Sequence, residues 1–269
     1  MIKKRLNVHL LQFSISWEKR EKNFKKVLSI LKKNRIKKGS IICLPEYFAT
    51  GFTLNSRNLA EDEKGPTSSF LSFLAKEYSS FVIGSSIIKT SNKKRPTNSA
   101  LVFSSNGKRI VRYDKSHLFT PGKEKTFYSR GKNISTFKVK GKLFAVVICF
   151  DLRFPELFRI LYEKNVTGIF VIANWPETRH HHWETLLRAR AIENQCFIFG
   201  VNRKGSSPYQ NYKGGTSIIG PFGNIIESSG RKNMISAEID INNADNEKKR
   251  FSIKNDRAFD TYKKYNPYK

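Results

Sequence analysis

The chain has 269 residues, of which 39% are hydrophobic and 13% aromatic, so it can form a sizeable core as one large domain or two small ones. Its 50 basic and 22 acidic residues give a formal net charge of +28, and no apolar run approaches the length of a membrane span. The three cysteines, Cys43, Cys149 and Cys196, have neither metal-ligand nor redox spacing, which favours a reducing, cytoplasmic compartment.

The positive charge has two interpretations. A basic surface is typical of nucleic-acid-binding proteins, which makes a nucleic-acid-binding protein the alternative from a different functional class. The lysines, however, are spread along the whole chain, and Lys, Asn, Ile, Ser and Phe are all abundant. This composition is typical of codon drift in an AT-rich genome, which explains the high lysine content without a binding role. We therefore expect that nucleic acid is not a partner. The apolar stretch after Lys3, Lys4 and Arg5 is interrupted by polar residues and is a poor candidate for a signal peptide.

The first half of the chain predicts strands that alternate with helices. A strand is expected over Leu6–Phe13 and an amphipathic helix over Trp17–Ile36, with Ser16 as its N-cap and Gly39 after its end. The elements expected next are a buried strand Ser40–Leu44, a helix Thr67–Ser79, a strand Phe81–Ile88, and a hairpin of Ser99–Phe103 and Lys108–Tyr113 across Asn106-Gly107.

The second half predicts a similar mixture of hairpins and strand–helix–strand units. The expected elements are a hairpin of Ser135–Val139 and Lys142–Ile148, a helix Pro155–Lys164, a strand Gly168–Ala173, a helix Trp183–Gln195, a strand Cys196–Val201, a hairpin of Gly215–Gly220 and Asn224–Ser228, and a strand Met234–Ile239. We expect one domain over residues 1–242, composed of two sheets packed face to face with helices outside. Residues 243–269 lack periodicity and are expected to form a basic tail that packs on this domain or on a dimer partner.

Cys149 ends the apolar run that begins at Leu143, just before the charged Asp151. The run is typical of a buried strand, and ligands of open α/β sheets collect at the carboxyl ends of strands. A thiol at this position can face a cleft. A lone cysteine is more often a core residue. This apolar run by itself therefore does not distinguish a thiol that faces a cleft from a cysteine in the core. Cys196 is interpreted as a core residue.

Glu46 and Lys115 share one property with Cys149, because each follows directly on a predicted strand or hairpin. We expect the three side chains to converge on one rim of the sandwich. There the carboxylate of Glu46 would take the thiol proton, as an activated nucleophile requires. The cation of Lys115 would lower the pKa of the Cys149 thiol from about 8.5 and stabilise a developing oxyanion.

Three consecutive histidines, His180, His181 and His182, suggest a metal site at first sight. Neighbouring residues do not converge on one ion, however, and no carboxylate has the spacing to join them. We therefore interpret them as part of a polar loop, and we expect no metal.

Three segments resemble the catalytic blocks of the carbon–nitrogen hydrolase (nitrilase) superfamily, in the same order: LPEYFATGF with Glu46, YDKSHLF with Lys115 and CFDLRFPE with Cys149. The similarity extends to Gln12, Asn23, Glu124, the segment RARAIENQ and a Gly-Pro-Phe-Gly hairpin, and so covers nearly the whole chain. The segments ANWPETR, GVNRKG and YKGG are similar to the omega-amidase branch. The neighbouring branch, which cleaves deaminated glutathione, is the alternative.

This resemblance implies an α/β fold, a four-layer α-β-β-α sandwich with two mixed sheets flanked by helices, and no cofactor. It implies a catalytic triad of Glu46, Lys115 and Cys149 that hydrolyses the terminal amide of 2-oxoglutaramate or 2-oxosuccinamate through a thioester. Glu124 would support the lysine, and the N–H of Phe150 would help to hold the oxyanion. It further implies a homodimer, with the C-terminal tail taking part in the contact.

A substrate of this kind carries a carboxylate, which a guanidinium binds well. Arg153 is therefore the first candidate for substrate binding, although an ion pair with Asp151 or Glu156 is an equally good interpretation of it. Arg179 and Arg203 are weaker candidates. Asn174 and Trp175 are further candidates, and Trp175 is equally well interpreted as a core residue.

Overall fold

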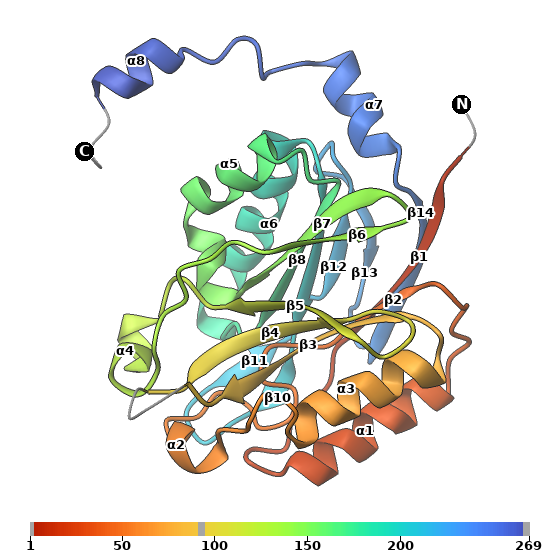
Figure 1. Ribbon diagram of the computed structural model, residues 1–269, viewed down its shortest axis with the longest axis vertical. Coiled ribbons are helices and arrows are strands. Elements are labelled where there is room, and N and C mark those ends of the chain that lie inside the picture. Colours follow the sequence, from red (N-terminus) through yellow and green to blue (C-terminus); the bar gives the residue numbers. More distant parts are fainter. Residues whose placement is uncertain (1–2, 91–94, 266–269) are drawn as a thin grey trace.

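The computed structural model, which describes residues 3–90 and 95–265, contains two six-stranded sheets packed face to face (Figure 1). The first sheet has the order β14-β1-β2-β3-β4-β5, with β14 Met234–Asp240, β1 Arg5–Leu11, β2 Ile41–Cys43, β3 Phe81–Ile88, β4 Thr97–Phe103 and β5 Arg109–Asp114. The second has the order β13-β12-β9-β8-β7-β6, with β13 Ile225–Ser228, β12 Ser217–Ile219, β9 Phe197–Asn202, β8 Gly168–Ala173, β7 Lys142–Ile148 and β6 Thr136–Val139.

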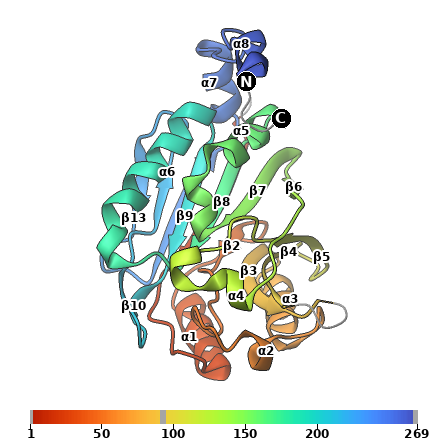
Figure 2. The same ribbon diagram turned by 90° about the vertical axis from the view of Figure 1, so that its left-hand side faces the viewer.

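Helices cover the outer face of each sheet (Figures 1 and 2). Helices α1 (Arg20–Lys32) and α3 (Pro66–Glu77) lie on the first sheet, and α5 (Pro155–Glu163) and α6 (His180–Asn194) lie on the second. The predicted four-layer α-β-β-α sandwich with two mixed sheets is therefore confirmed. The shorter elements are α2 Ser56–Leu59, α4 Glu124–Phe127, α7 Asn243–Arg250, α8 Phe259–Lys264 and a separate ribbon of β10 Lys204–Ser206 and β11 Asn211–Lys213.

The central strands of both sheets are parallel and buried on both faces, which is why they read as continuous apolar runs. In β2, Ile41 and Cys43 belong to the core cluster shared with the second sheet, whereas Ile42 packs in the cluster under α1 and α3. The parallel pairs place the carboxyl ends of β2 and β3 at one edge, and those of β7, β8 and β9 at the corresponding edge of the second sheet. The site lies where these edges meet.

The first helix is shorter than the sequence predicts. Helix α1 begins at Arg20 instead of Trp17 and ends at Lys32, and Ser16 makes no capping hydrogen bond from its side chain. The cause is Asn23, whose side-chain oxygen accepts the N–H of Ser16 at 2.7 Å while its Nδ2 donates to the carbonyls of Ser16 and Ala49, each at 2.7 Å. These bonds hold the residues before α1 in a turn and leave no room for another helical turn.

Two segments form helices where none was predicted. The three histidines open α6 and do not form a loop, because the helix starts at His180 directly after the short 3-10 helix Glu177–Arg179. In the C-terminal segment, α7 buries Ala244, and the ammonium of Lys248 donates to the carbonyl of Val166 at 2.9 Å. Figure 1 shows α7 and α8 extending past α5 beyond the body of the sandwich.

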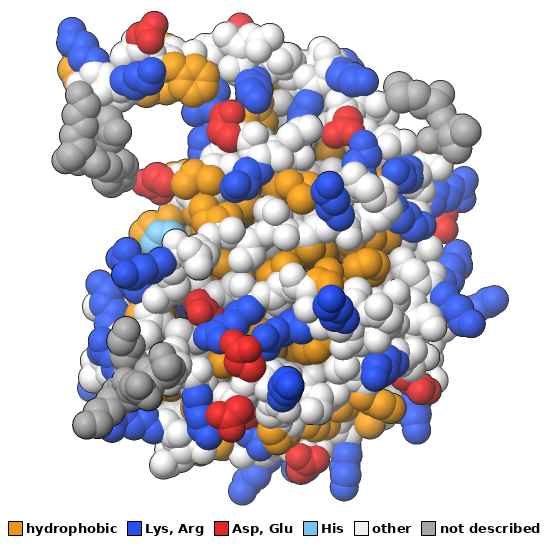
Figure 3. Space-filling model, in the orientation of Figure 1, with side chains coloured by type: hydrophobic (Ala, Val, Ile, Leu, Met, Phe, Trp, Pro, Cys, Tyr) orange, Lys and Arg blue, Asp and Glu red, His pale blue; other side chains and the backbone are white. Residues whose placement is uncertain are grey.

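The surface is basic without a single basic stripe on the face drawn in Figure 3, where Lys and Arg are scattered among neutral and apolar side chains. Across the described ranges, 3–90 and 95–265, no helix combines the length and the apolar character needed to cross a bilayer.

Candidate active site

The side chains of Glu46, Lys115 and Cys149 line one pocket at the rim of the sandwich. Glu46 follows β2 and Lys115 follows β5, so both come from the first sheet, whereas Cys149 follows β7 of the second. The other lining residues are Phe52, Phe119, Phe150, Arg153, Asn174, Trp175, Pro176, Arg179, Gln210 and Tyr212. The structure thus brings together the three residues that the strand ends single out, in a pocket lined in part by aromatic side chains.

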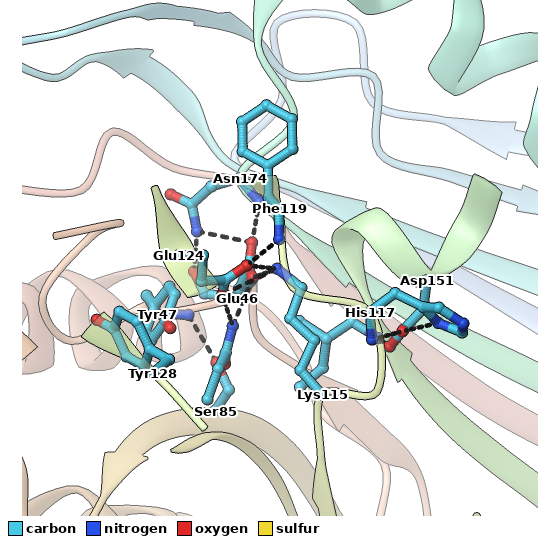
Figure 4. Close-up of polar contacts among 12 residues, drawn as sticks. Glu46, Tyr47, Ser85, Lys115, His117, Phe119, Glu124, Tyr128, Asp151 and Asn174 are labelled. Carbon is cyan, nitrogen blue, oxygen red and sulfur yellow. Dashed lines mark hydrogen bonds and ion pairs between the residues drawn. The ribbon is translucent and has the colours of Figure 1, made fainter. Parts of the chain in front are cut away.

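Lys115 lies between two carboxylates, and all three side chains are almost completely buried (Figure 4). Its Nζ is 3.1 Å from Oε1 of Glu46 and 2.9 Å from Oε2 of Glu124. Burial of Lys115 lowers the pKa of its ammonium, but Glu124 and Glu46 more than offset this, so that the pKa stands well above its ordinary value. The lysine is therefore a permanent cation.

Glu124 is less favourably placed for ionisation. Burial raises the pKa of its carboxyl above the usual value, Lys115 opposes this rise, and the nearby Glu46 adds to it. Its Oε2 accepts the backbone N–H of Phe119 at 2.7 Å, which fixes the carboxyl beside the ammonium.

Two asparagines orient the carboxylate of Glu46. The Nδ2 of Asn98, in β4, donates to Oε1 of Glu46 at 2.7 Å and to Oε1 of Glu124 at 3.3 Å. The backbone N–H of Asn174 donates to Oε2 of Glu46 at 2.8 Å, and its side-chain amide donates to the main-chain carbonyl of Glu46. Asn98 is missing from the sequence prediction, which begins this strand at Ser99, one residue after it.

Cys149 occupies a sharp turn between β7 and the 3-10 helix Cys149–Arg153, with a φ of +47°. Left-handed backbone is strained for a residue with a side chain, and such strain concentrates at functional sites. Asp151 holds the turn, because its buried carboxylate accepts the N–H of Ile148 at 2.9 Å and the hydroxyl of Tyr113 at 2.7 Å. It also accepts the N–H of His117 at 3.0 Å (Figure 4). No pattern in the sequence predicts these hydrogen bonds of Asp151.

The effect of these groups on the thiol corrects one expectation. Burial raises the pKa of the Cys149 thiol well above its ordinary value, and Glu46 and Glu124 raise it further. The ammonium of Lys115 does lower this pKa, as expected, but burial and the two carboxylates outweigh it, so the net shift is upward and not downward from 8.5. The resting thiol therefore keeps its proton, and a neighbouring base must remove that proton as the sulfur attacks.

The remaining candidates separate into pocket residues and structural residues. Phe150, Trp175 and Arg179 line the pocket, and so does Arg153. Arg153 is not paired with Asp151, since its Nη2 is 3.1 Å from Nδ1 of His182 and its Cζ lies 4.9 Å from the centroid of a Trp175 ring.

Arg203 is fully buried outside the pocket. Its Nη2 donates to the carbonyl of Ser206 at 2.7 Å and to that of Ile15 at 3.1 Å, and its guanidinium lies 4.3 Å from the ring centroid of Tyr212. Arg203 therefore lies away from the pocket, with its Nη2 bound to main-chain oxygens and its Nη1 buried without a hydrogen-bond partner among the described residues, and its role in binding the substrate carboxylate stays a prediction. No group of three metal-ligating side chains occurs in the part of the chain that the structure describes.

This arrangement combines a thiol, a base and a fixed cation around one accessible point. The thiol is a nucleophile once deprotonated, Glu46 is a base held by three donors, and the ammonium of Lys115 can stabilise a negative oxygen. These are the requirements of acyl transfer from an amide or a nitrile.

Comparison with known proteins agrees with this chemistry. A family model described as carbon-nitrogen hydrolase matches residues 7–249. The protein named 2-oxoglutaramate amidase from Bacillus subtilis is 34% identical over 87% of this chain and 90% of its own length. "Omega-amidase NIT2" from Xenopus tropicalis is 32% identical over 96% of this chain and 97% of its own. The crystal structure of a CN-hydrolase superfamily protein from Xanthomonas campestris superimposes with a TM-score of 0.88 at 29% identity, covering 94% of this chain and 97% of that one.

Proposed function

Because the chain belongs to the carbon–nitrogen hydrolase family, we propose that it is a cysteine-dependent amidase for small 2-oxo dicarboxylic acid monoamides. The observation that carries the proposal is the convergence of Cys149, Glu46 and Lys115 on one pocket. The names of the relatives, omega-amidase and 2-oxoglutaramate amidase, support 2-oxoglutaramate and 2-oxosuccinamate as the substrates.

In the proposed cycle, Glu46 accepts the thiol proton while the Cys149 sulfur attacks the amide carbonyl. The resulting oxyanion is held by the ammonium of Lys115 and by the N–H of Phe150. The carbon–nitrogen bond then breaks, and Glu46 returns the proton to the leaving ammonia. A thioester remains. Water that gives a proton to Glu46 attacks the thioester, and the acid and the free thiol are released. Glu124 takes no proton in this cycle and holds Lys115 in place.

An ammonia-release screen tests the proposal. Its substrates are 2-oxoglutaramate, 2-oxosuccinamate, deaminated glutathione, glutamine, asparagine and simple nitriles. We expect the highest kcat/KM for the two 2-oxo monoamides. A clear preference for deaminated glutathione would support the neighbouring branch instead, and no ammonia from any of these compounds would refute the amidase proposal.

We also propose that the protein is a homodimer joined through the helical layer of the second sheet. Ile160 on α5 and Ile192 on α6 are 47% and 55% exposed and offer apolar surface for such a contact. The C-terminal helices α7 and α8 extend past the same layer, where they can reach a second copy (Figure 1).

Light scattering coupled to gel filtration is expected to give a mass of twice 31.1 kDa. A glutamate at position 192, Ile192→Glu, buries a charge in the proposed contact and should produce monomers. Ile110→Glu is the matched control, because Ile110 is 40% exposed on β5 of the other sheet and should leave the mass unchanged. A wild-type monomer, or an unchanged dimer of Ile192→Glu, would contradict the proposed interface.

A further inference from the structure

A second cavity, of about 460 Å³, lies between α6 and the hairpin of β12 and β13. This volume is within the usual range for sites that hold small molecules. The cavity and the pocket of Cys149 have no lining residue in common. Along α6 the lining runs from His180 to Arg188, a little over two helical turns, so the cavity is a groove about 12 Å long.

Three cations line this groove without a partner of opposite charge. They are Arg188, Lys213 and Arg231, and none of them forms an ion pair or donates a side-chain hydrogen bond within the part of the chain that the structure describes. The lining contains one carboxylate, that of Glu184, whose Oε1 lies 3.2 Å from Nε2 of His180. The groove therefore has an excess of positive charge, which favours a multiply charged anion.

Hydroxyl groups add hydrogen-bond donors at one end of the groove. Ser217 of β12 and Ser228 of β13 are direct cross-strand partners, so their side chains lie on the same face of the hairpin, and both line the cavity. Neither hydroxyl bonds to another described residue, whereas the hydroxyl of the adjacent Ser229 donates to Gln12 at 2.8 Å. Cations and free hydroxyls close together are the donors that phosphate oxygens bind.

The other end of the hairpin presents an apolar pair to the same groove. Ile219 of β12 and Ile225 of β13 are also cross-strand partners that line the cavity, and Ile225 is 46% exposed. This isoleucine pair lies toward the turn of the hairpin, whereas the two serines lie at its open end, near Lys213 and Arg231 in the chain. The groove thus offers a polar end for an anion and an apolar wall for the group attached to it.

We propose that this groove binds a small phosphate monoester. The phosphate lies between Lys213 and Arg231 and accepts the hydroxyls of Ser217 and Ser228, while the attached apolar group packs on the isoleucine pair. A dianion matches cations that outnumber the one carboxylate, and its tetrahedral oxygens can accept from donors on several sides. Because the groove is separate from the pocket of Cys149, the proposal stands or falls independently of the amidase function.

Calorimetric titration of the full chain with phenyl phosphate tests the proposal. Benzenesulfonate, which has the same ring and one charge fewer, and inorganic phosphate, which has no ring, should both bind more weakly. We expect Lys213→Gln and Arg231→Gln each to weaken the binding of phenyl phosphate about 10- to 100-fold, the range for a lost hydrogen bond between charged groups. Glu184→Gln removes the carboxylate from the lining and should strengthen binding about twofold to fivefold.

Arg35→Gln is the matched control, because Arg35 is exposed outside the groove and the variant loses the same charge. Lys213→Arg, which keeps the charge, should bind within a few-fold of the wild type and separates loss of the contact from misfolding. Equal weakening in Arg35→Gln and Arg231→Gln would mean that the net charge of +28 holds the anion and would overturn the site. Equal affinities for phenyl phosphate and benzenesulfonate, or no binding of phenyl phosphate at millimolar concentration, would overturn it as well.

Discussion

Replacing Cys149 by alanine is expected to lower the rate of amide hydrolysis by at least ~10⁴-fold, because no other group in the pocket can form the covalent bond to the carbonyl. Glu46 and Lys115 would remain in place, so that substrate can still bind, but a water molecule attacking directly would lack the thioester route. Glu46→Gln should lose most of the activity for a related reason. The glutamine cannot accept the thiol proton, and a thiol with a raised pKa is almost never ionised on its own.

The measurement is ammonia release at saturating substrate, together with mass spectrometry of acid-quenched enzyme to detect the acyl group on Cys149. Cys196→Ala serves as the control, because Cys196 is a buried core residue away from the pocket. It should keep the activity per folded molecule. Turnover of Cys149→Ala within tenfold of the wild type would refute the nucleophile assignment, and so would an acyl group found on any other residue.

Replacing Lys115 by methionine should remove activity and also destabilise the fold by about 3–5 kcal/mol, the typical cost of removing one partner from a buried ion pair. The variant leaves Glu46 and Glu124 next to each other without a cation, both nearly inaccessible to water. The same change removes the donor for the oxyanion. The free energy of unfolding is measured by urea titration and the activity by ammonia release.

The loss of stability in Lys115→Met should be smaller at pH 5 than at pH 8. The pKa of Glu124 is already raised in the folded protein, and removing Lys115, which lowers it, would raise it further. A carboxyl with a raised folded-state pKa destabilises the fold as the pH rises from its unfolded value, about 4.3, through its folded value. Lys89→Met is the control, because Lys89 forms an exposed pair with Asp62 that should contribute less than about 1 kcal/mol. Equal stability of Lys115→Met and Lys89→Met would contradict the role of Lys115 in balancing the two acids.

The sequence predicts the residues of the site better than the contacts among them. Glu46, Lys115 and Cys149 stand out because each ends a strand, and strand ends meet at sheet edges whatever the details of packing. Asn98 and Asp151 do not stand out, because their roles depend on partners that are distant along the chain. Asn98 reaches Glu46, which lies 52 positions earlier, and Asp151 accepts from Tyr113, which lies 38 positions earlier. The pattern of neighbouring residues in the sequence does not indicate which distant side chains will form hydrogen bonds with each other.

Departures from the predicted elements have similar physical causes. Helix α1 starts late because the side chain of Asn23 bonds to the loop before it, a competition that hydrophobic periodicity does not report. Helix α7 is strongly polar and buries only Ala244 and Glu247, so its sequence lacks the apolar stripe by which a helix is recognised. The net rise in the pKa of the Cys149 thiol is not predictable from the sequence, because burial, its largest cause, and the approach of Glu46 and Glu124 depend on the tertiary structure.

The division of the pocket between the two sheets has a consequence for the nascent chain. Glu46 and Lys115 belong to the first sheet, Cys149 follows β7, and the N–H that orients Glu46 comes from Asn174, just after β8. A ribosome-bound polypeptide that has exposed only the residues up to Lys115 therefore carries the acid and the ammonium of the pocket but not the thiol of Cys149. We therefore expect the proposed hydrolysis of amides to begin only once the second sheet has packed on the first.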